Sequence, residues 1–505
     1  MYASLVNEWL ADDEDMRDKL PIDLSGSHLF DFCKGGIGLC KMINVAVPGT
    51  IDERAIKLKA TSPWDVNYNC ELCLNSARSV GIVVVNIGAD DLNAGTPHLV
   101  LGLVWQIVKM HLLAGIDIKE IPELACLLDE GETLQDLMRL PKDKILLRWL
   151  NYHLERAGSP DSATNFGPDL QNSTMLTRVL NQLAPECCDL SALAVPDHTE
   201  RAKSLLSGAS AMGTKHNATP PAIVNGNPKV CLAFVASLFN TRHGLEIPKD
   251  VDMAELMDDD EGDTREARTY KMWVNSLGCA QYCNDLGEDT RDGYLLCDLM
   301  SKLKPGCVDM GKVTKPPIRF PFKKVENCNR AVEAAKGLGF SLPGTGGADF
   351  VEGNTRLLLG LSWQMMRYSC VNLLKELSSN GKDVSDDDII AWANERVRSG
   401  GKSSTASSGG MGIKSFKDAS LATSLYALEL LHSIEERVVN WDIVSAGADY
   451  DAKKRNALYA ISVARALGCR VFLLWEDIVE VRPKMLMTLF ASIMATALKR
   501  GKGAE

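Results

Sequence analysis

The sequence lacks several features that would assign it to a protein class at once. It has no run of 18 uninterrupted apolar residues, the length that a membrane-spanning helix needs, and no charged-then-apolar leader follows Met1. Its formal net charge is −11, whereas a general nucleic-acid-binding protein usually has a basic surface. We therefore expect a cytoplasmic protein with no membrane insertion and no nucleic-acid partner.

Motifs that carry catalytic chemistry are also missing. The eight histidines are scattered, with no visible Ser/Cys/His arrangement. The glycine-rich stretches 35–40 and 344–353 do not stand between a strand and a helix at the dinucleotide spacing, and 208–215 ("GASAMGTK") lacks the Lys-Ser/Thr ending of a phosphate loop. The sequence predicts no enzyme, no catalytic residue and no cofactor, and leaves a cluster assembled in space as the alternative.

The fifteen cysteines do not form a metal-binding pattern. Their number is odd, and most lie inside apolar helical runs, as reduced core thiols do. Cys70 and Cys73 form a C-x-x-C, but no second pair or histidine cluster follows at zinc-ligand spacing. We predict buried thiols and no metal site.

What the sequence does contain is a fourfold repeat. The stretches "GTPHLVLGLVWQIVK" from Gly95, "GNPKVCLAFVASLFN" from Gly226, "GNTRLLLGLSWQMMR" from Gly353 and "VRPKMLMTLFASIMA" from Val481 follow one another at nearly equal intervals. Units of this size are long enough to bury their own cores, so the repeat predicts four domains rather than a solenoid. We place the domains at 1–116, 128–243, 265–378 and 384–501.

Each repeat is predicted to be helical. The four stretches are apolar on nearly every face, and caps or prolines at their starts indicate a buried core helix. Before each lies a second helix that ends at a glycine, at 69–81, 201–213, 327–339 and 456–468. A middle helix is expected within 29–44, 172–186, 290–306 and 420–434, and each repeat opens with a helix that carries Leu5, Trp149, Trp273 or Trp392. Strand signals are scarce, so the predicted fold class is all-α.

The segments between these helices have the composition of connections. Residues 115–130 and 243–264 carry proline and acidic residues and are predicted to be linkers. The acidic run Asp258–Glu261 is interpreted as solvated linker rather than a metal site. The stretch 399–412 is predicted to be a Gly/Ser loop within the last repeat.

The stretch "VVNIGADDLNAGTPHLVLGLVWQIVK" (84–109) resembles the calponin-homology domain in its actin-binding form. Together with 35–56, 131–155 and 325–367, it makes the whole chain similar to the fimbrin (plastin) family. The resemblance implies four calponin-homology domains arranged as two tandem actin-binding regions. It further implies a monomer of the actin cytoskeleton that binds filamentous actin and crosslinks the filaments into tight bundles.

The same resemblance implies which residues contact the filament. They belong to the first helix of the leading domain (5–14), to the turn and core helix of the first and third domains (86–109 and 347–367), and to part of the following domain's first helix. The first and third domains are the ones that keep the pattern Leu-Gly-Leu-x-Trp, at 101–105 and 359–363. For the first pair the candidates are Leu5, Asn7, Glu8, Asn86, Ile87, Gly88, Asp90, Asp91, Asn93, Gly95, Thr96, His98, Gln106 and Lys109. For the second pair they are Gly347, Asp349, Glu352, Gly353, Asn354, Arg356, Gln364 and Arg367.

Several alternatives stay open at this stage. Leu101, Leu103 and Trp105 are expected to pack in the core rather than to bind, which leaves the polar positions as the better contact candidates. Two binding regions crosslink only if both engage different filaments, so the protein would otherwise decorate one filament. Besides an enzyme, the other alternative to an actin-binding protein is a binding scaffold of another kind, such as a microtubule-tip protein. Fimbrins usually carry calcium-binding EF-hands ahead of the first domain. This sequence contains no such loop, so we expect either a protein without that headpiece or a core that lacks it.

Overall fold

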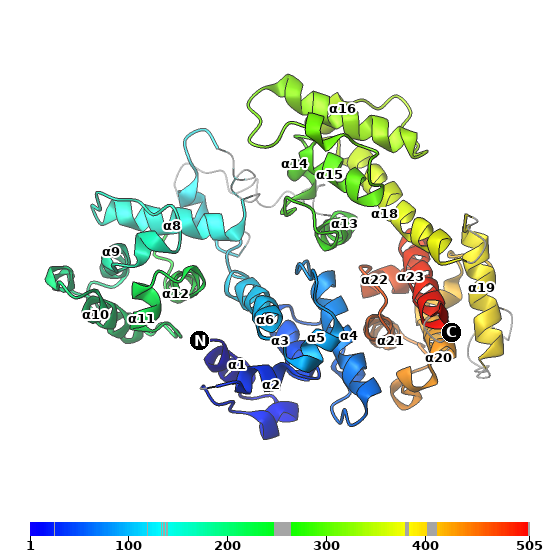
Figure 1. Ribbon diagram of the computed structural model, residues 1–505, viewed down its shortest axis with the longest axis horizontal. Coiled ribbons are helices and arrows are strands. Elements are labelled where there is room, and N and C mark those ends of the chain that lie inside the picture. Colours follow the sequence, from blue (N-terminus) through cyan, green and yellow to red (C-terminus); the bar gives the residue numbers. More distant parts are fainter. Residues whose placement is uncertain are drawn as a thin grey trace. The chain divides into compact units, whose positions relative to one another are not determined.

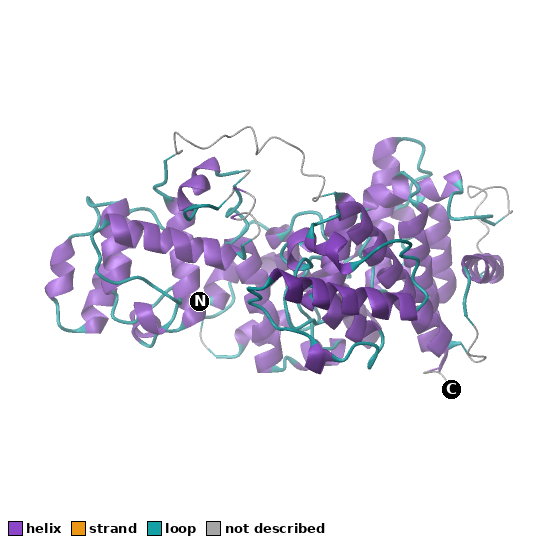
Figure 2. Cartoon of the chain, turned by 90° about the horizontal axis from the view of Figure 1, so that it is seen from above, coloured by secondary structure: helices purple, strands orange, loops and turns teal. Residues whose placement is uncertain are grey.

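The computed structural model describes residues 1–24, 26–118, 120–132, 134, 137, 140–246, 264–378, 383–400 and 412–502. Within these ranges every regular element is a helix (Figure 1, Figure 2). In this described part, no helix combines the length and apolar character that crossing a membrane requires. The all-α prediction is confirmed.

The helices follow the fourfold repeat along the chain (Figure 1). The first repeat holds α1 (Tyr2–Trp9), α2 (His28–Cys33), α3 (Ile37–Ala46), α4 (Pro63–Ser79), α5 (Ala89–Ala94) and α6 (Pro97–Leu112). The second holds α8 (Lys142–Arg156), α9 (Thr174–Leu183), α10 (His198–Ala211), α11 (Pro220–Val224) and α12 (Pro228–Thr241). The third holds α13 (Arg265–Ser276), α14 (Leu286–Asp289), α15 (Tyr294–Leu303), α16 (Pro321–Gly337), α17 (Gly347–Val351) and α18 (Thr355–Leu377). The fourth holds α19 (Asp386–Ser399), α20 (Leu425–Ile434), α21 (Tyr450–Ala466), α22 (Trp475–Val479) and α23 (Pro483–Lys502).

Short 3-10 helices connect these elements. They are η1 (Glu14–Lys19), η2 (Glu53–Ala55), η3 (Pro122–Leu127), η4 (Pro168–Leu170), η5 (Leu190–Ala194), η7 (Met310–Lys312), η9 (Ala419–Thr423), η10 (Glu436–Val438) and η11 (Trp441–Ile443). The segment 115–130 is more ordered than a plain linker, because Leu124 and Leu127 of η3 are buried. Most of 243–264, including Asp258–Glu261, and most of 399–412 lie outside the described residues.

The four quoted stretches form helices α6, α12, α18 and α23, as predicted. Asn227 caps α12 by accepting from the backbone N–H groups of Lys229 and Val230, and Asn354 caps α18 by accepting from that of Leu357. Most of their apolar residues are buried, with Phe234 and Phe490 1% and 0% exposed. These helices are therefore core helices of their repeats.

The middle helix starts abruptly in every repeat. The residue before α3, α9, α15 and α20 has left-handed backbone, at Gly36, Ser173, Gly293 and Ser424 (φ 75°, 62°, 73° and 63°). This turn corrects the predicted continuous helices over 29–44 and 420–434, which are divided into α2 and α3 and into η9 and α20. A Cβ at Gly293 would lie 2.5 Å from the backbone nitrogen of Cys328, so this turn also brings two backbones into close contact.

The second repeated helix ends where the sequence predicts but begins earlier. Gly81, Gly213, Gly339 and Gly468 all have φ between 84° and 99° and follow α4, α10, α16 and α21. Each helix begins before the predicted start, by six residues in α4, α16 and α21 and by three residues in α10. Polar N-caps mark three of these starts: Ser62, Asp197 and Asp449.

The chain divides into two compact units, one from 1–32 and 101–259 and the other from 33–100 and 260–505. Within the first unit, Trp149 of α8 packs edge-on against Phe239 of α12, with ring centroids 5.4 Å apart. Within the second unit, α4 of the first repeat packs on α21 of the fourth and on α13 of the third. The second unit therefore joins elements from opposite ends of the sequence.

A buried polar side chain organises each repeat. Asn327 of α16 donates through Nδ2 to the carbonyls of Thr314 (2.9 Å) and Asp292 (3.0 Å), and its Oδ1 accepts from the N–H of Thr314 (3.0 Å). Asn69 and Asn456 hold Lys57 and Ser445 with the same two-way bond. The side chain thereby ties the helix to the loop ahead of it.

We predict that Asn327→Ala lowers the free energy of unfolding of the third repeat by about 2–3 kcal/mol, because it leaves buried backbone groups of Thr314 and Asp292 without partners. The control is Glu333→Ala, an exposed position on the same helix. Thermal unfolding and hydrogen exchange of the third repeat are the measurements. Equal stability of the two variants would contradict the structural role of Asn327.

Candidate functional site

The first candidate segment is a turn followed by a core helix. Gly88 starts α5, and the carboxylate of Asp91 accepts from its backbone N–H at 2.9 Å, while Gly95 ends α5 with φ 71°. The exposed candidates here are Asn86, Gly88, Asp90, Asn93 and His98. Ile87, Asp91, Thr96, Gln106 and Lys109 are half-buried, and Gly95 is buried. The segment therefore presents polar side chains on a capped turn.

The third repeat carries the same arrangement. The carboxylate of Asp349 accepts from the backbone N–H of Gly346 at 2.8 Å, and Gly353 has φ 81°. Glu352, Asn354 and Arg356 are exposed, Asp349, Gly353, Gln364 and Arg367 are half-buried, and Gly347 is buried. Gln364 exchanges two hydrogen bonds with the backbone of Ser341, so this amide is occupied within the repeat. His98 and Arg356 occupy equivalent exposed positions in the first turn of α6 and α18.

The first helix presents little of its surface. Leu5 is 8% exposed and lines a small cavity with Val230 and Phe234 of α12. Asn7 exchanges two hydrogen bonds with the backbone of Ile22. Glu8 is exposed and lies 3.6 Å from the ammonium of Lys215. Of the three candidates on α1, Glu8 alone is an exposed side chain.

The Leu-Gly-Leu-x-Trp pattern is only partly a core feature. Leu103 is 3% exposed, as the packing prediction requires, but Leu101 and Trp105 are half-buried. The indole of Trp105 packs against Tyr2, at 6.5 Å between centroids, and the ammonium of Lys229 lies over it at 5.6 Å. In the second pair Lys484 lies over Trp363 at 5.7 Å. Both tryptophans therefore contact the second domain of their own pair, which we call the trailing repeat: Trp105 contacts the second repeat and Trp363 contacts the fourth.

An ion pair accompanies each of these cation–π contacts. Lys109 lies 3.2 Å from a carboxylate oxygen of Asp143 on α8, and Arg367 lies 2.7 Å from one of Asp386 on α19. We call the two cation–π contacts and these two ion pairs the pair clamp. Lys109 and Arg367, both predicted partner contacts, thus already bind the trailing repeat. The sequence prediction missed their partners, although the equivalent Pro228-Lys229 and Pro483-Lys484 were a visible signal.

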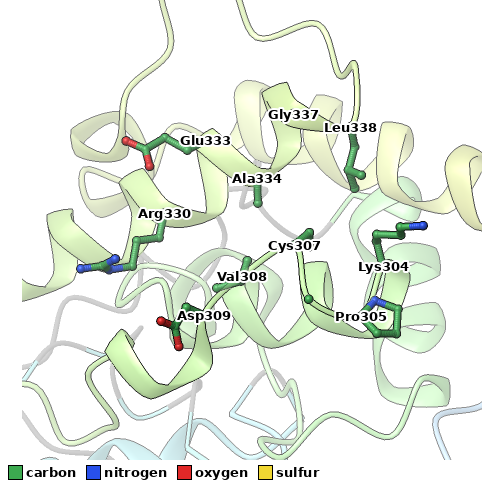
Figure 3. Close-up of a pocket in the computed structure, with 11 residues that line it drawn as sticks. Lys304, Pro305, Cys307, Val308, Asp309, Arg330, Glu333, Ala334, Gly337 and Leu338 are labelled. Carbon is green, nitrogen blue, oxygen red and sulfur yellow. The ribbon is translucent and has the colours of Figure 1, made fainter.

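A hollow in the third repeat does not have the chemistry of an enzyme site. It measures about 520 Å³ and lies between the segment that follows α15 and helix α16 (Figure 3). Arg330 and Glu333 project from α16, and Asp309 comes from the facing segment (Figure 3). Its one thiol, Cys307, donates to the carbonyl of Met300, and burial raises its pKa. Among the described residues that line the hollow there is no histidine that could act as a general base.

The two cysteines of the C-x-x-C are buried thiols. Cys70 and Cys73 are buried, and burial raises the pKa of Cys70 to about 12, so the thiol stays protonated. In the described part of the chain, His, Cys, Asp and Glu side chains nowhere gather into a group of three that could hold a metal ion. The buried-thiol prediction is confirmed for this pair.

We predict that Arg367→Ala combined with Lys484→Ala loosens the fourth repeat from the third. The loss of one ion pair and one cation–π contact is worth about 1 kcal/mol, which corresponds to roughly five-fold faster amide exchange in α19 and the first turn of α23. Hydrogen exchange measures this directly. Lys203→Ala, which breaks an exposed ion pair with Glu200, is the control. Unchanged exchange at α19 would show that the pair clamp does not hold the two repeats together.

Comparison with known proteins agrees with the fourfold repeat. The calponin homology (CH) domain family matches residues 9–112, 140–244, 264–370 and 383–499. The chain is 46% identical to Fimbrin-5 of Arabidopsis thaliana over 508 residues, which covers 100% of this chain and 73% of that protein. It is 42% identical to human Plastin-3 over 515 residues, covering 99% and 80%.

A solved structure extends the similarity to the fold. The structure described as the actin-crosslinking core of Schizosaccharomyces pombe fimbrin matches with a TM-score of 0.82 and 39% identity, and the match covers 98% of each chain. Four CH-domain matches and relatives aligned along the whole chain place it in one family. The chain belongs to the fimbrin/plastin family.

Proposed function

We propose that this chain binds filamentous actin through two tandem pairs of CH domains and crosslinks filaments into bundles, without catalysis. The observation that carries the proposal is the duplication of the candidate site. The capped turn, the exposed first-turn residue and the tryptophan of the core helix occur in the first and third repeats at the same spacing. One chain with two such surfaces is bivalent, which is the requirement for crosslinking.

The solved relative supports this proposal, since it is an actin-crosslinking core and its fold covers nearly all of this chain. Filamentous actin is the partner that this similarity implies. We further propose that the protein acts as a monomer in the cytoplasm, at the actin cytoskeleton. The domains would span 1–116, 128–243, 265–378 and 384–501, as the repeat spacing predicts.

The exposed residues of the two turns are our strongest contact candidates. In the first pair these are Asn86, Gly88, Asp90, Asn93 and His98, together with Glu8 on α1. In the second pair they are Glu352, Asn354 and Arg356. The buried or occupied candidates, such as Leu5, Gly347 and Gln364, would support the surface from below. Lys109 and Arg367 would set the angle between the two domains of each pair through the pair clamp.

Sedimentation with filamentous actin tests the function. We expect actin in the low-speed pellet only when the protein is present, because two engaged pairs join filaments into bundles. Co-sedimentation at high speed alone would mean that the chain decorates single filaments. Absence from both pellets, or preference for microtubules in a parallel sample, would overturn the proposal.

Variants of single pairs test the site. We predict that Asn93→Ala with His98→Ala, or Glu352→Ala with Arg356→Ala, abolishes low-speed bundling while the protein still follows actin at high speed through its intact pair. All four substitutions together should lower the fraction bound at high speed at least five-fold. Lys203→Ala, an exposed residue of the second repeat, is the matched control. Normal bundling by both double variants would place the contacts elsewhere.

A further inference from the structure

The third repeat exposes two phenylalanines side by side. Phe320 and Phe322 are 63% and 62% exposed, and their ring centroids lie 5.7 Å apart with an interplanar angle of 34°. They lie in "KVTKPPIRFPFKK" (312–324), at the start of α16. We call the two rings and the basic residues of this segment the aromatic–basic patch: Lys312, Lys315, Arg319, Phe320, Phe322, Lys323 and Lys324.

Comparison among the repeats shows that this exposure is not required by the fold. The residue before the equivalent helix is Ser62, Asp197 or Asp449 in the other three repeats, and each accepts a capping hydrogen bond from the helix backbone. In the third repeat Phe320 takes this place and makes no side-chain cap. The third repeat therefore has an exposed apolar ring where the other repeats have a stabilising N-cap. This indicates that the ring belongs to a binding surface.

The charged residues of the segment that holds the two rings are all basic. The segment 312–324 contains five basic residues and no acidic one, in a protein with a net charge of −11. Lys323 lies over the ring of Phe322 at 5.5 Å, and it and Lys312 pair with Glu326 and Asp309. Lys315 and Arg319 are exposed and make no ion pair with any residue that the structure describes. The segment therefore carries two exposed cations without an ion pair to a described residue, together with two exposed apolar rings.

The surroundings of the two rings fit a lipid bilayer better than a protein partner. The hollow beside Phe322 is lined by Glu326, Asn329, Arg330 and Glu333 as well as Val325, so it offers no apolar pocket that would hold a partner's side chain. Figure 3 shows Arg330 and Glu333 pointing outward from the same helix. Aromatic rings that protrude next to basic residues match the boundary of an anionic bilayer, where rings enter the acyl region and cations meet phosphate.

We propose that the aromatic–basic patch is a peripheral docking site for an anionic lipid membrane. Phe320 and Phe322 enter the headgroup–acyl boundary, and Lys315 and Arg319 bind lipid phosphates. Such docking requires no spanning helix. It would bring a filament-binding protein to a membrane surface through its third domain.

Vesicle sedimentation with the full chain tests this proposal. The probes are vesicles of phosphatidylcholine mixed with phosphatidylserine and vesicles of phosphatidylcholine alone. We expect binding to the anionic vesicles only, weakened by added salt. Phe320→Ser with Phe322→Ser should lower the bound fraction at least five-fold, and so should Lys315→Glu with Arg319→Glu. Leu190→Ser, which removes an exposed leucine next to Asp189, is the matched control and should bind as the parent does.

The Phe320→Ser substitution also protects the test from a folding artefact. It restores a capping residue at the place of Ser62, so the melting temperature should not fall. Actin bundling by this variant should be unchanged. The proposal is overturned if the parent binds neither vesicle, or if the phenylalanine variant binds anionic vesicles as well as the parent. Loss of actin binding with retained lipid binding would assign the patch to the filament instead.

Discussion

The buried amide in the second turn of α4, α16 and α21 is the constraint on which these repeats depend. Asn69, Asn327 and Asn456 are at most 2% exposed, and each holds both polar groups of one loop residue. Asn327 and Asn456 also bind the carbonyl that precedes the left-handed turn, at Asp292 and Thr423. Because buried backbone groups need partners, this side chain determines where the middle helix begins.

The second repeat solves the same problem with a different residue. Arg201 stands at the equivalent position and donates to the carbonyls of Asn172 (2.7 Å) and Val195 (2.6 Å). Asn172 precedes the left-handed Ser173, as Asp292 precedes Gly293. An arginine reaches both acceptors but offers no acceptor of its own, so the two-way bond to one residue is lost. The left-handed turn at Ser173 forms without an asparagine because the carbonyl before it needs only a hydrogen-bond donor, which Arg201 supplies.

Contacts between repeats use longer side chains. Arg465 of α21 is 5% exposed, donates to the carbonyl of Thr50 at 2.9 Å, and its own carbonyl accepts from Asn75 of α4. Burial lowers the pKa of this guanidinium to about 10, so it carries its charge at neutral pH, and none of the carboxylates that the structure describes pairs with it. The contact joins the first and fourth repeats within one compact unit. In the pair clamp, too, a long cationic side chain reaches a neighbouring repeat: Lys229 contacts Trp105, and Lys484 contacts Trp363.

The sequence was enough to infer the helical class, the number of repeats and the glycines that end the second helix, because these depend on local periodicity and on left-handed backbone. It also located the two capped turns. Which residues of these turns stay exposed and unpaired depends instead on how the folded chain packs. Lys109 and Gln364 look alike as polar helix residues, but one pairs with Asp143 and the other with the backbone of Ser341. Such partners come from other elements, so no local pattern encodes them, and exposure at Phe320 depends equally on what the fold leaves uncovered.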